Sequence, residues 1–224
     1  MRISPVPLFD TPAPSGSPNG AWAWLSPLGA AEQGPLSGPE RARVSRLANE
    51  QARGALSDHL TERRALLAKL LDGPAEQVAI GHDEHGAPCL QDHPGIHVSF
   101  SRSGRWNALA CSAASEVGVD IELVRDTGWK PMLEMICKPS EAGELRAAVD
   151  RAGTLVPFFR LWTIKEAVLK AAGSGLKGGA KRVGVPLCLM ELDSSGKRIA
   201  LDDRAYRVDV SSSDACVVAR ALRV

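Results

Sequence analysis

The chain has 224 residues, of which 44% are hydrophobic, and its 27 basic and 26 acidic residues give a formal net charge of +1. A chain of this length buries a working core as one large domain or as two of about 110 residues each. The balanced charge does not indicate attraction to nucleic acid or to a membrane surface. No run approaches the roughly 20 apolar residues of a membrane span and the N-terminus lacks the apolar centre of a signal peptide, so we expect a cytoplasmic protein. Five scattered cysteines without a CxxC pair do not indicate a disulfide framework or a zinc site.

The first third of the chain is expected to pass from turn-rich surface segments into helix. Residues 4–20 hold five prolines, and residues 26–39 are again rich in turn formers. Residues 39–71 have apolar residues at helical spacing, which predicts one long helix or two consecutive helices that stop at a Gly-Pro pair. Seven basic residues from Arg41 to Lys69, against three acidic ones, give this region a basic face. A solvated helix surface explains that face as well as a binding role does.

Short strands are expected in the middle and at the end of the chain, with two helices between them. The patterns predict strands at 77–80, 95–101, 105–112, 116–124, 181–192, 197–203, 205–212 and 215–224, and helices at 140–149 and 156–172. The second helix is expected to end at Gly173, a residue suited to the left-handed turn that closes a helix.

The two halves of the chain share a rough order of helix followed by strands, with a hinge near residue 113. We therefore expect an α+β protein with two subdomains, residues 1–113 and 114–224, that face each other. A cleft between two subdomains is a natural site for a small molecule. A single mixed domain is the alternative.

The stretch VGVDIELV carries two candidate metal ligands. Strand alternation places Asp120 and Glu122 on one face, opposite the apolar side chains. Their backbone positions are about 6 to 7 Å apart, so both carboxylates can converge on one cation. Mg²⁺ prefers one or two carboxylates, several waters and the oxygens of a phosphate. An amphipathic strand with a solvated acidic face is the alternative.

The predicted helix at 156–172 adds a third carboxylate and an ammonium group. At about 100° per residue, Glu166, Lys170 and Trp162 share one side of this helix. Because a tryptophan is rarely left in water, that side is expected to face a partly covered cleft. A carboxylate and an ammonium group beside a metal would suit a pyrophosphate, with the lysine neutralising charge on the departing oxygen. Ion pairs at this spacing are also common on exposed helix surfaces.

The stretch SFSRSGRW places Ser101, Arg102, Ser103 and Arg105 in a strand-to-turn segment. Hydroxyl and guanidinium groups of this kind hold phosphate oxygens. A polar hairpin explains the stretch equally well. The glycines of GSGL, residues 173–176, are a weak signal for a phosphate loop, because such loops usually begin a helix.

Three stretches occur together in this sequence: GVDIE at 118–122, WTIKEAVLKAAGSGL at 162–176 and SFSRSG at 99–104. From about Pro39 to Leu176 the chain resembles the 4'-phosphopantetheinyl transferases, specifically the surfactin-synthetase-activating type. The resemblance implies transfer of phosphopantetheine from coenzyme A to a serine of an acyl or peptidyl carrier protein, with release of adenosine 3',5'-bisphosphate. It also implies a monomer of two ferredoxin-like α/β halves related by a pseudo-twofold, with the active site between them.

The resemblance also assigns roles to individual residues. Asp120, Glu122 and Glu166 match the ligands of Mg²⁺, with Mn²⁺ as an alternative ion. Lys165 and Lys170 match lysines near the coenzyme A phosphates. Glu166 is the expected base for the incoming serine, directly or through water, so Glu166 and Lys170 are the expected catalytic residues.

Looser matches concern the rest of coenzyme A. Gly86 and Pro88 resemble a Gly-Lys-Pro turn near the adenine, although Ala87 replaces the lysine. Arg41 and Arg64 fit basic positions that approach the 3'-phosphate. These four residues are therefore expected to bind coenzyme A.

One position departs from the family pattern. Arg102, next to Ser101, stands where the motif usually has a histidine. Arginine can serve if this position binds phosphate, because it is a permanent bidentate donor, but it cannot exchange a proton. Since phosphoryl transfer depends mainly on positioning and charge neutralisation, we expect Ser101 and Arg102 to bind coenzyme A.

Two other functions stay open from the sequence. One is a non-catalytic module that binds coenzyme A or a carrier protein, which Arg102 and Ala87 suggest; the other is a metal-dependent hydrolase of a nucleotide pyrophosphate. Carrier proteins are often acidic, so Lys177, Lys181 and Arg182 could receive one, although a solvated loop explains these residues equally well. The sequence does not indicate which carrier protein or pathway is served, or whether acylated coenzyme A is accepted.

Overall fold

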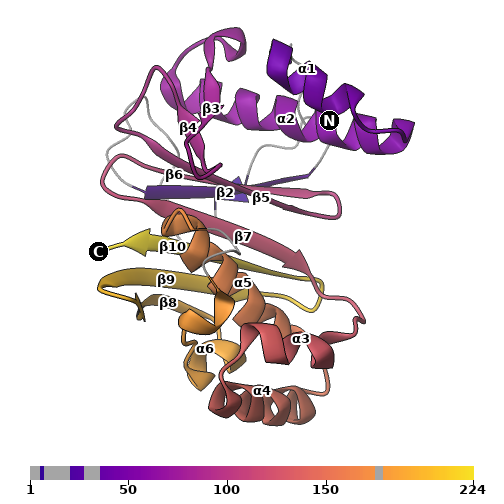
Figure 1. Ribbon diagram of the computed structural model, residues 1–224, viewed down its shortest axis with the longest axis vertical. Coiled ribbons are helices and arrows are strands. Elements are labelled where there is room, and N and C mark those ends of the chain that lie inside the picture. The colour runs from indigo at the N-terminus through magenta and orange to yellow at the C-terminus, as the bar shows by residue number, and fades with distance from the viewer. Residues whose placement is uncertain (1–5, 8–20, 28–35, 175–178) are drawn as a thin grey trace.

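The structure is a computed structural model that describes residues 6–7, 21–27, 36–174 and 179–224. The turn-rich segments predicted at 4–20 and 26–39 fall largely outside these residues. Two antiparallel sheets are stacked on each other, and helices cover both outer faces of the stack (Figure 1). The mixture of helix and sheet predicted from the sequence is confirmed.

The N-terminal sheet has six strands in the order β1-β2-β6-β5-β4-β3. They are β1 (Val6–Pro7), β2 (Ala21–Pro27), β3 (Ile80–His82), β4 (Pro88–Leu90), β5 (His97–Ser103) and β6 (Trp106–Ser112). Helices α1 (Gly38–Ser45) and α2 (Glu50–Leu71) lie over its outer face, and the short 3-10 turn η1 (Ala75–Gln77) leads into β3 (Figure 1).

The C-terminal sheet has four strands in the order β7-β10-β9-β8. They are β7 (Val117–Leu123), β8 (Ser194–Leu201), β9 (Arg204–Ser212) and β10 (Cys216–Arg223). Its outer face carries α3 (Trp129–Ile136), α4 (Pro139–Ala152), α5 (Val156–Ala171), the turn η3 (Ala180–Arg182) and α6 (Leu187–Glu191), with α5 directly against the strands (Figure 1). The helix expected at 156–172 is thus confirmed, and Gly173 follows it with a φ of +70°.

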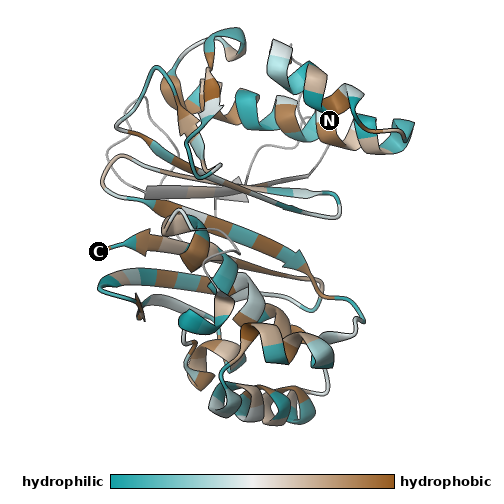
Figure 2. Cartoon of the chain, viewed as in Figure 1, coloured by the Kyte–Doolittle hydropathy of each residue, from teal (hydrophilic) through white to brown (hydrophobic). Residues whose placement is uncertain are grey.

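Apolar side chains form three layers of core. One lies between α2 and the N-terminal sheet, one between the two sheets, and one between the C-terminal sheet and its helices. Brown and teal bands alternate along β7 in Figure 2, although both faces of its first five residues are buried, one against the other sheet and one against α5. In the middle layer the small side chains of Ala108 and Ala110 meet Val119 and Ile121. These small residues let β5 and β6 approach β7 closely.

Polar side chains fix the beginnings of the first two helices. At α1, the Ser37 hydroxyl accepts a hydrogen bond from the Glu40 amide at 3.4 Å, and the Glu40 carboxylate accepts one from the Ser37 amide at 2.7 Å. At α2, the Asn49 side chain accepts a hydrogen bond from the amide of Ala52 at 3.1 Å. The second cap is the reason why the segment predicted at 39–71 forms two helices.

The strand predicted at 181–192 is wrong, because this segment forms η3 and α6 instead. Pro186 is the N-cap of α6, and Leu189 and Met190 are fully buried in the core around α5. A short apolar run of this length cannot be assigned to strand or helix from periodicity alone. The sequence patterns also did not predict α3, β2 or β4. The strand predicted at 77–80 is mostly wrong, because η1 ends at Gln77 and β3 begins only at Ile80.

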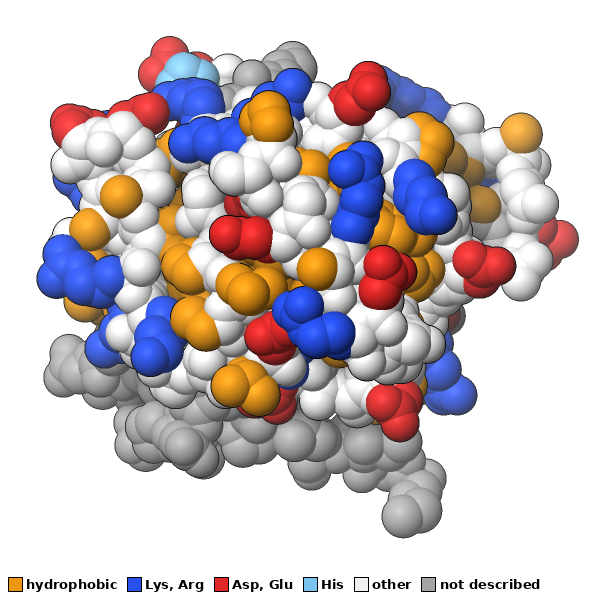
Figure 3. Space-filling view, turned by 90° about the horizontal axis from the view of Figure 1, so that it is seen from below, with side chains coloured by type: hydrophobic (Ala, Val, Ile, Leu, Met, Phe, Trp, Pro, Cys, Tyr) orange, Lys and Arg blue, Asp and Glu red, His pale blue; other side chains and the backbone are white. Residues whose placement is uncertain are grey.

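None of the helices in the described ranges combines the length and the apolar character needed to cross a bilayer. On the face shown in Figure 3, basic and acidic side chains are interspersed around small apolar patches. No single sign of charge dominates the described residues of that face, in keeping with the balanced composition.

Helix α5 touches β7 at Gly118. A Cβ atom on this glycine would lie 2.0 Å from the carbonyl oxygen of Ala167 and 2.6 Å from the amide nitrogen of Ala171. Both are backbone atoms, so neither can rotate away. We expect Gly118→Ala to lower the free energy of unfolding by about 1 to 3 kcal/mol, measured by urea denaturation. Gly143→Ala is the control, because nothing lies within 4 Å of the added Cβ on α4; an equal effect in both variants would contradict the prediction.

Candidate active site

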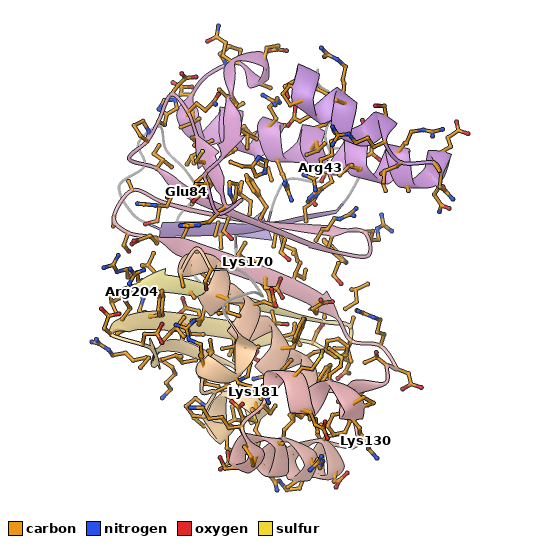
Figure 4. All side chains as sticks on the ribbon, in the orientation of Figure 1. Arg43, Glu84, Lys130, Lys170, Lys181 and Arg204 are labelled. Carbon is orange, nitrogen blue, oxygen red and sulfur yellow. The ribbon has the colours of Figure 1, made fainter. Side chains whose placement is uncertain are left out.

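Side chains from β5, β7 and α5 meet where the two sheets approach each other. Asp120 projects from β7, and Glu166 and Lys170 project from α5. Lys170 lies at the end of α5 next to the N-terminal sheet (Figure 4). Asp120 and Glu166 are buried, with exposed fractions of 4% and 8%. The structure therefore brings together three residues that the sequence motifs had placed in one site.

The Lys170 ammonium group is held by three oxygen atoms. It donates hydrogen bonds to Asp120 Oδ1 at 2.7 Å, to the Val119 carbonyl at 3.1 Å and to the Phe100 carbonyl at 3.4 Å. These contacts tie α5 to β7 and to β5. They also set a positive charge directly against the Asp120 carboxylate, which favours its ionised form.

Two buried carboxylate oxygens in this site, Oδ2 of Asp120 and Oε1 of Glu166, have no hydrogen-bond partner among the described residues. Burial raises the pKa of Asp120, although the Lys170 charge opposes this effect. Burial and the neighbouring charge of Asp120 raise the pKa of Glu166 to about 7. An unpaired buried charge is costly, and one divalent cation would satisfy both oxygens, since Mg²⁺ takes one or two carboxylates from a protein. This pair of residues therefore fits a divalent cation.

Glu122 is held differently from the other two carboxylates. Its Oε2 accepts hydrogen bonds from the Ser103 hydroxyl at 2.9 Å and from Arg125 at 3.0 Å. Within the parts of the chain that the structure describes, no three histidine, cysteine, aspartate or glutamate side chains form a group that could hold a metal ion. The bonds from Ser103 and Arg125 engage one oxygen of Glu122, and its charge adds to burial in raising the pKa of both Asp120 and Glu166. A role for Glu122 as the third metal ligand stays a prediction.

Alternate residues of β5 face opposite sides of the N-terminal sheet. Ser101 faces β7, where its hydroxyl donates to Asp120 Oδ1 at 2.6 Å. Arg102 faces α2, where its charge acts on the buried His59. The sequence interpretation assigned Ser101 and Arg102 to coenzyme A together. Their opposite directions mean that one ligand group cannot touch both side chains.

A basic cluster of Arg43, Arg63 and Arg102 lies on the α2 side of the sheet. The Arg63 guanidinium stacks over the Phe100 ring, 4.3 Å from its centre. Burial and the charges of Arg43 and Arg102 lower the pKa of Arg63 to about 9. Figure 4 shows Arg43 between α1 and the sheet. Like charges held this close favour a bound anion, and the sequence analysis did not single out Arg43 or Arg63 because both lay among many basic helix residues.

A pocket opens beside Lys170. It has a volume of about 230 Å³, and its lining includes Gly86, Pro88, Phe100 and Gly173. A neighbouring cavity of about 300 Å³ shares Pro88 and Lys170 with it. Gly86 has a φ of +85°, a conformation that favours glycine. The structure thus places the predicted Gly86 and Pro88 turn next to the predicted phosphate-binding lysine.

Comparison with known proteins identifies the family. Residues 116–218, which include the carboxylates and Lys170, match the model of the 4'-phosphopantetheinyl transferase superfamily. A relative from Synechocystis sp., provisionally named a 4'-phosphopantetheinyl transferase, is 32% identical over 172 residues, which cover 71% of this chain and 68% of the relative. The chain belongs to the 4'-phosphopantetheinyl transferase superfamily.

Further relatives carry the same name. The 4'-phosphopantetheinyl transferase of Bacillus subtilis is 31% identical over 157 residues, which cover 67% of each chain. HetI of Nostoc sp., also a 4'-phosphopantetheinyl transferase, is 30% identical over 145 residues, which cover 63% of this chain and 61% of the relative. The resemblance inferred from the motifs is confirmed, and the chain belongs to a family of transferase enzymes.

Lys165 of this phosphopantetheinyl transferase does not line the pocket, contrary to the expectation from its motif. Its side chain is fully buried, and its ammonium group donates to Glu141 at 2.8 Å and to the carbonyls of Ala180 and Val183. Helix geometry explains the difference, because Lys165 and Lys170 project about 140° apart around α5. Lys165 therefore fastens α5 to α4 and η3.

The two arginines assigned to the 3'-phosphate are also placed differently from the expectation. Arg64 is buried and forms an ion pair with Glu40 of α1 at 2.5 Å, so its charge is used within the fold. Arg41 is exposed and bonds to a backbone carbonyl near the start of its own helix. Neither lines the cavities beside Lys170. Arg43 and Arg63, which lie with Arg102, are better placed to meet an anion.

The basic residues considered for carrier-protein binding are only partly described. Lys177 lies outside the described residues. Lys181 is exposed, and Arg182 forms an ion pair with Asp202. A role for Lys177, Lys181 or Arg182 in carrier binding stays a prediction.

A buried polar network between α2 and the N-terminal sheet was not foreseen. His59 is hydrogen-bonded to Asn107, whose amide also donates to Glu62. Burial and the charge of Arg63 lower the pKa of His59 from 6.5 to about 3. The folded protein therefore holds this histidine neutral over a pH range in which the unfolded chain binds a proton.

This lowered pKa predicts a loss of stability in acid. The contribution of His59 is complete above its unfolded pKa of 6.5 and is lost as the pH falls toward about 3. Between these two pKa values, the free energy of unfolding is expected to fall by up to about 1.4 kcal/mol for each pH unit. Urea denaturation at several pH values should show a shallower acid slope for His59→Gln than for the wild type. His93→Gln, at an exposed position, is the control, and a His59→Gln slope equal to the wild type would contradict the assignment.

Proposed function

We propose that this protein transfers the 4'-phosphopantetheine group from coenzyme A to a serine hydroxyl of an acyl or peptidyl carrier protein, with Mg²⁺ as the cofactor. The observation that carries the proposal is the pair of buried oxygens on Asp120 and Glu166, beside Lys170, that have no partner in the described parts of the chain. Membership of the superfamily supports it, since the named relatives are 4'-phosphopantetheinyl transferases.

Asp120 and Glu166 would hold the cation in this proposal. When bound, Mg²⁺ neutralises the pyrophosphate of coenzyme A and favours attack on its phosphorus. Mn²⁺, with a similar preference for oxygen, is an alternative ion. Glu122, whose Oε2 bonds to Ser103 and Arg125, is the proposed third ligand through its other oxygen.

Residues of the chain manage the charges of the transfer. The serine oxygen bonds to the phosphorus next to pantetheine, and the bond from that phosphorus to the bridging oxygen breaks. Adenosine 3',5'-bisphosphate leaves, and Lys170 neutralises the charge on its departing oxygen. The serine proton passes to Glu166, directly or through a water molecule.

The remaining parts of coenzyme A are assigned by the shape and charge around Lys170. The adenine is proposed to lie in the pocket at Gly86 and Pro88. Arg102, with Arg43 and Arg63, offers guanidinium groups for a phosphate on the other face of β5. Arginine at position 102 serves this role because it stays charged at every working pH.

We also propose that the chain acts as a monomer whose halves, residues 1–113 and 114–224, are ferredoxin-like units related by a pseudo-twofold. The division falls between the last strand of the N-terminal sheet and β7. This division supports the assignment of the adenine side to the first half and of Asp120 and Glu166 to the second.

Mass spectrometry of a panel of apo carrier proteins tests the function. After incubation with the protein, coenzyme A and Mg²⁺, at least one carrier is expected to gain the mass of one phosphopantetheinyl group. A carrier whose acceptor serine is replaced by alanine, and a reaction with EDTA, are the controls. Unchanged masses across the panel would contradict the proposal. Release of free phosphopantetheine in the absence of a carrier would instead indicate a hydrolase. Binding of coenzyme A without transfer would indicate a non-catalytic module.

A further inference from the structure

The three alternate serines of β5 all bond to β7, but in two different ways. Ser99 accepts a hydrogen bond from the backbone amide of Val119 at 3.1 Å. Ser101 instead donates to a side-chain carboxylate, that of Asp120, at 2.6 Å. The Ser103 hydroxyl does both, because it donates to the Glu122 carboxylate at 2.9 Å and accepts from the backbone amide of Leu123 at 3.0 Å. All three serines are buried, so these bonds are part of the interior where the sheets meet.

The bond from Ser101 determines which oxygen of Asp120 is free. Oδ1 accepts from Ser101 and, at 2.7 Å, from the ammonium group of Lys170. Oδ2 is buried and has no partner among the described residues. A hydrogen bond from a hydroxyl to a carboxylate is strong and directional, so it fixes the plane of the Asp120 carboxylate.

The same bond argues against direct contact between Ser101 and a phosphate. A serine hydroxyl has one hydrogen to donate, and the Ser101 hydrogen is used on Asp120. Phosphate oxygens are acceptors, so they need a donor that is not already engaged. Lys170 has three hydrogens, and the one on the Phe100 carbonyl makes a long bond of 3.4 Å that a phosphate oxygen could replace while the bond to Asp120 is kept. Ser101 has no second hydrogen to offer.

We propose that Ser101 is a positioning residue that orients Asp120 for the divalent cation, and that it does not contact coenzyme A. This inference rests on the proposed function and names a role for a residue that the motif resemblance had assigned to coenzyme A. Hydrogen-bond partners of metal-binding carboxylates typically change metal affinity about 10- to 100-fold when they are removed.

Calorimetric titration of the protein with Mn²⁺ alone, without coenzyme A, tests the proposal. Ser101→Ala is expected to weaken Mn²⁺ binding about 10- to 100-fold, and Ser101→Thr, which keeps the hydroxyl, is expected to restore most of it. Ser101→Cys keeps nearly the same volume with a weak donor, and it is expected to behave like Ser101→Ala. Ser99→Ala is the matched control, because Ser99 lies on the same face of the same strand and bonds to a backbone amide instead of a carboxylate.

A second titration separates the two roles of Ser101. With Mn²⁺ saturating, coenzyme A is expected to bind Ser101→Ala as tightly as it binds the wild type. Ser101→Ala that binds coenzyme A more weakly but keeps its Mn²⁺ affinity would overturn the inference. So would a wild-type protein that binds no Mn²⁺, or a loss of Mn²⁺ affinity in Ser99→Ala equal to that in Ser101→Ala. If Ser101→Ala weakens Mn²⁺ binding as expected but the wild type modifies no carrier protein, the inference is supported and the proposed function is overturned.

Discussion

Replacing Glu166 with glutamine is expected to reduce transfer to a carrier protein about 10²- to 10⁴-fold, the range for loss of a positioned acid or base. The fold should persist, because glutamine has the same shape and removes a buried charge, one of whose oxygens has no partner within the described ranges. Because the pKa of Glu166 is raised from 4.5 to about 7, its folded form binds a proton more tightly than the unfolded chain does. Its stability contribution is therefore lost as the pH rises through this interval, and the metal-free variant should be at least as stable as the wild type at neutral pH.

Two measurements check this prediction separately. Carrier mass under initial-rate conditions reports transfer, and urea denaturation of the metal-free protein reports stability. Glu144→Gln is the control, because Glu144 is an exposed carboxylate on α4 outside the site. Turnover of Glu166→Gln at the wild-type rate would remove Glu166 from the mechanism, and a large loss of stability would show that its role is structural.

Replacing Lys165 with methionine is expected to lower the free energy of unfolding by about 3 to 5 kcal/mol, because the buried Glu141 keeps its bond from the Val185 amide but loses the positive charge that balances its own. The pair lies in the interior, with the two groups 0% and 7% exposed. Adding Glu141→Gln to Lys165→Met removes the unpaired charge and should recover part of the loss. Urea denaturation measures both changes.

The neighbouring Lys170 gives the matched comparison. Lys170→Met should strongly reduce transfer to a carrier protein. The folded molecules of Lys165→Met should keep a larger share of the wild-type transfer activity than Lys170→Met does. Lys130→Met, which replaces an exposed lysine of α3 (Figure 4), should change stability by less than about 0.5 kcal/mol. If Lys165→Met proved as stable as Lys130→Met, the buried ion pair would not have the role assigned to it.

The parts of the site that were predicted from the sequence depend on local periodicity. Alternation along β7 predicts which face of the strand carries Asp120, and the helical repeat of α5 predicts that Glu166 and Lys170 share one side of the helix. Each prediction uses a single element, and together they allowed the three residues to be assigned to one cleft. The turn at Gly86 and Pro88 was assigned from the family resemblance and not from periodicity. The helix that carries the site was also predicted correctly, because it is long and ends at a glycine.

The parts that were missed depend on partners far away in the chain. Lys165 looked like a second phosphate ligand until its partner Glu141, 24 residues away in sequence, was placed beside it. The hydrogen bond from Ser103 to Glu122 could not be predicted either, because it arises from the packing of two sheets. The segment that forms α6 is too short for its apolar pattern to choose between helix and strand.

A crystal structure with coenzyme A and Mn²⁺, with the ion located by its anomalous scattering, tests the central claim most directly. The account predicts one ion within about 2.1 Å of both Asp120 Oδ2 and Glu166 Oε1, a normal distance for an oxygen ligand of such a cation, with coenzyme A in the pocket beside Lys170. Bound coenzyme A with no ion between these two oxygens would contradict it.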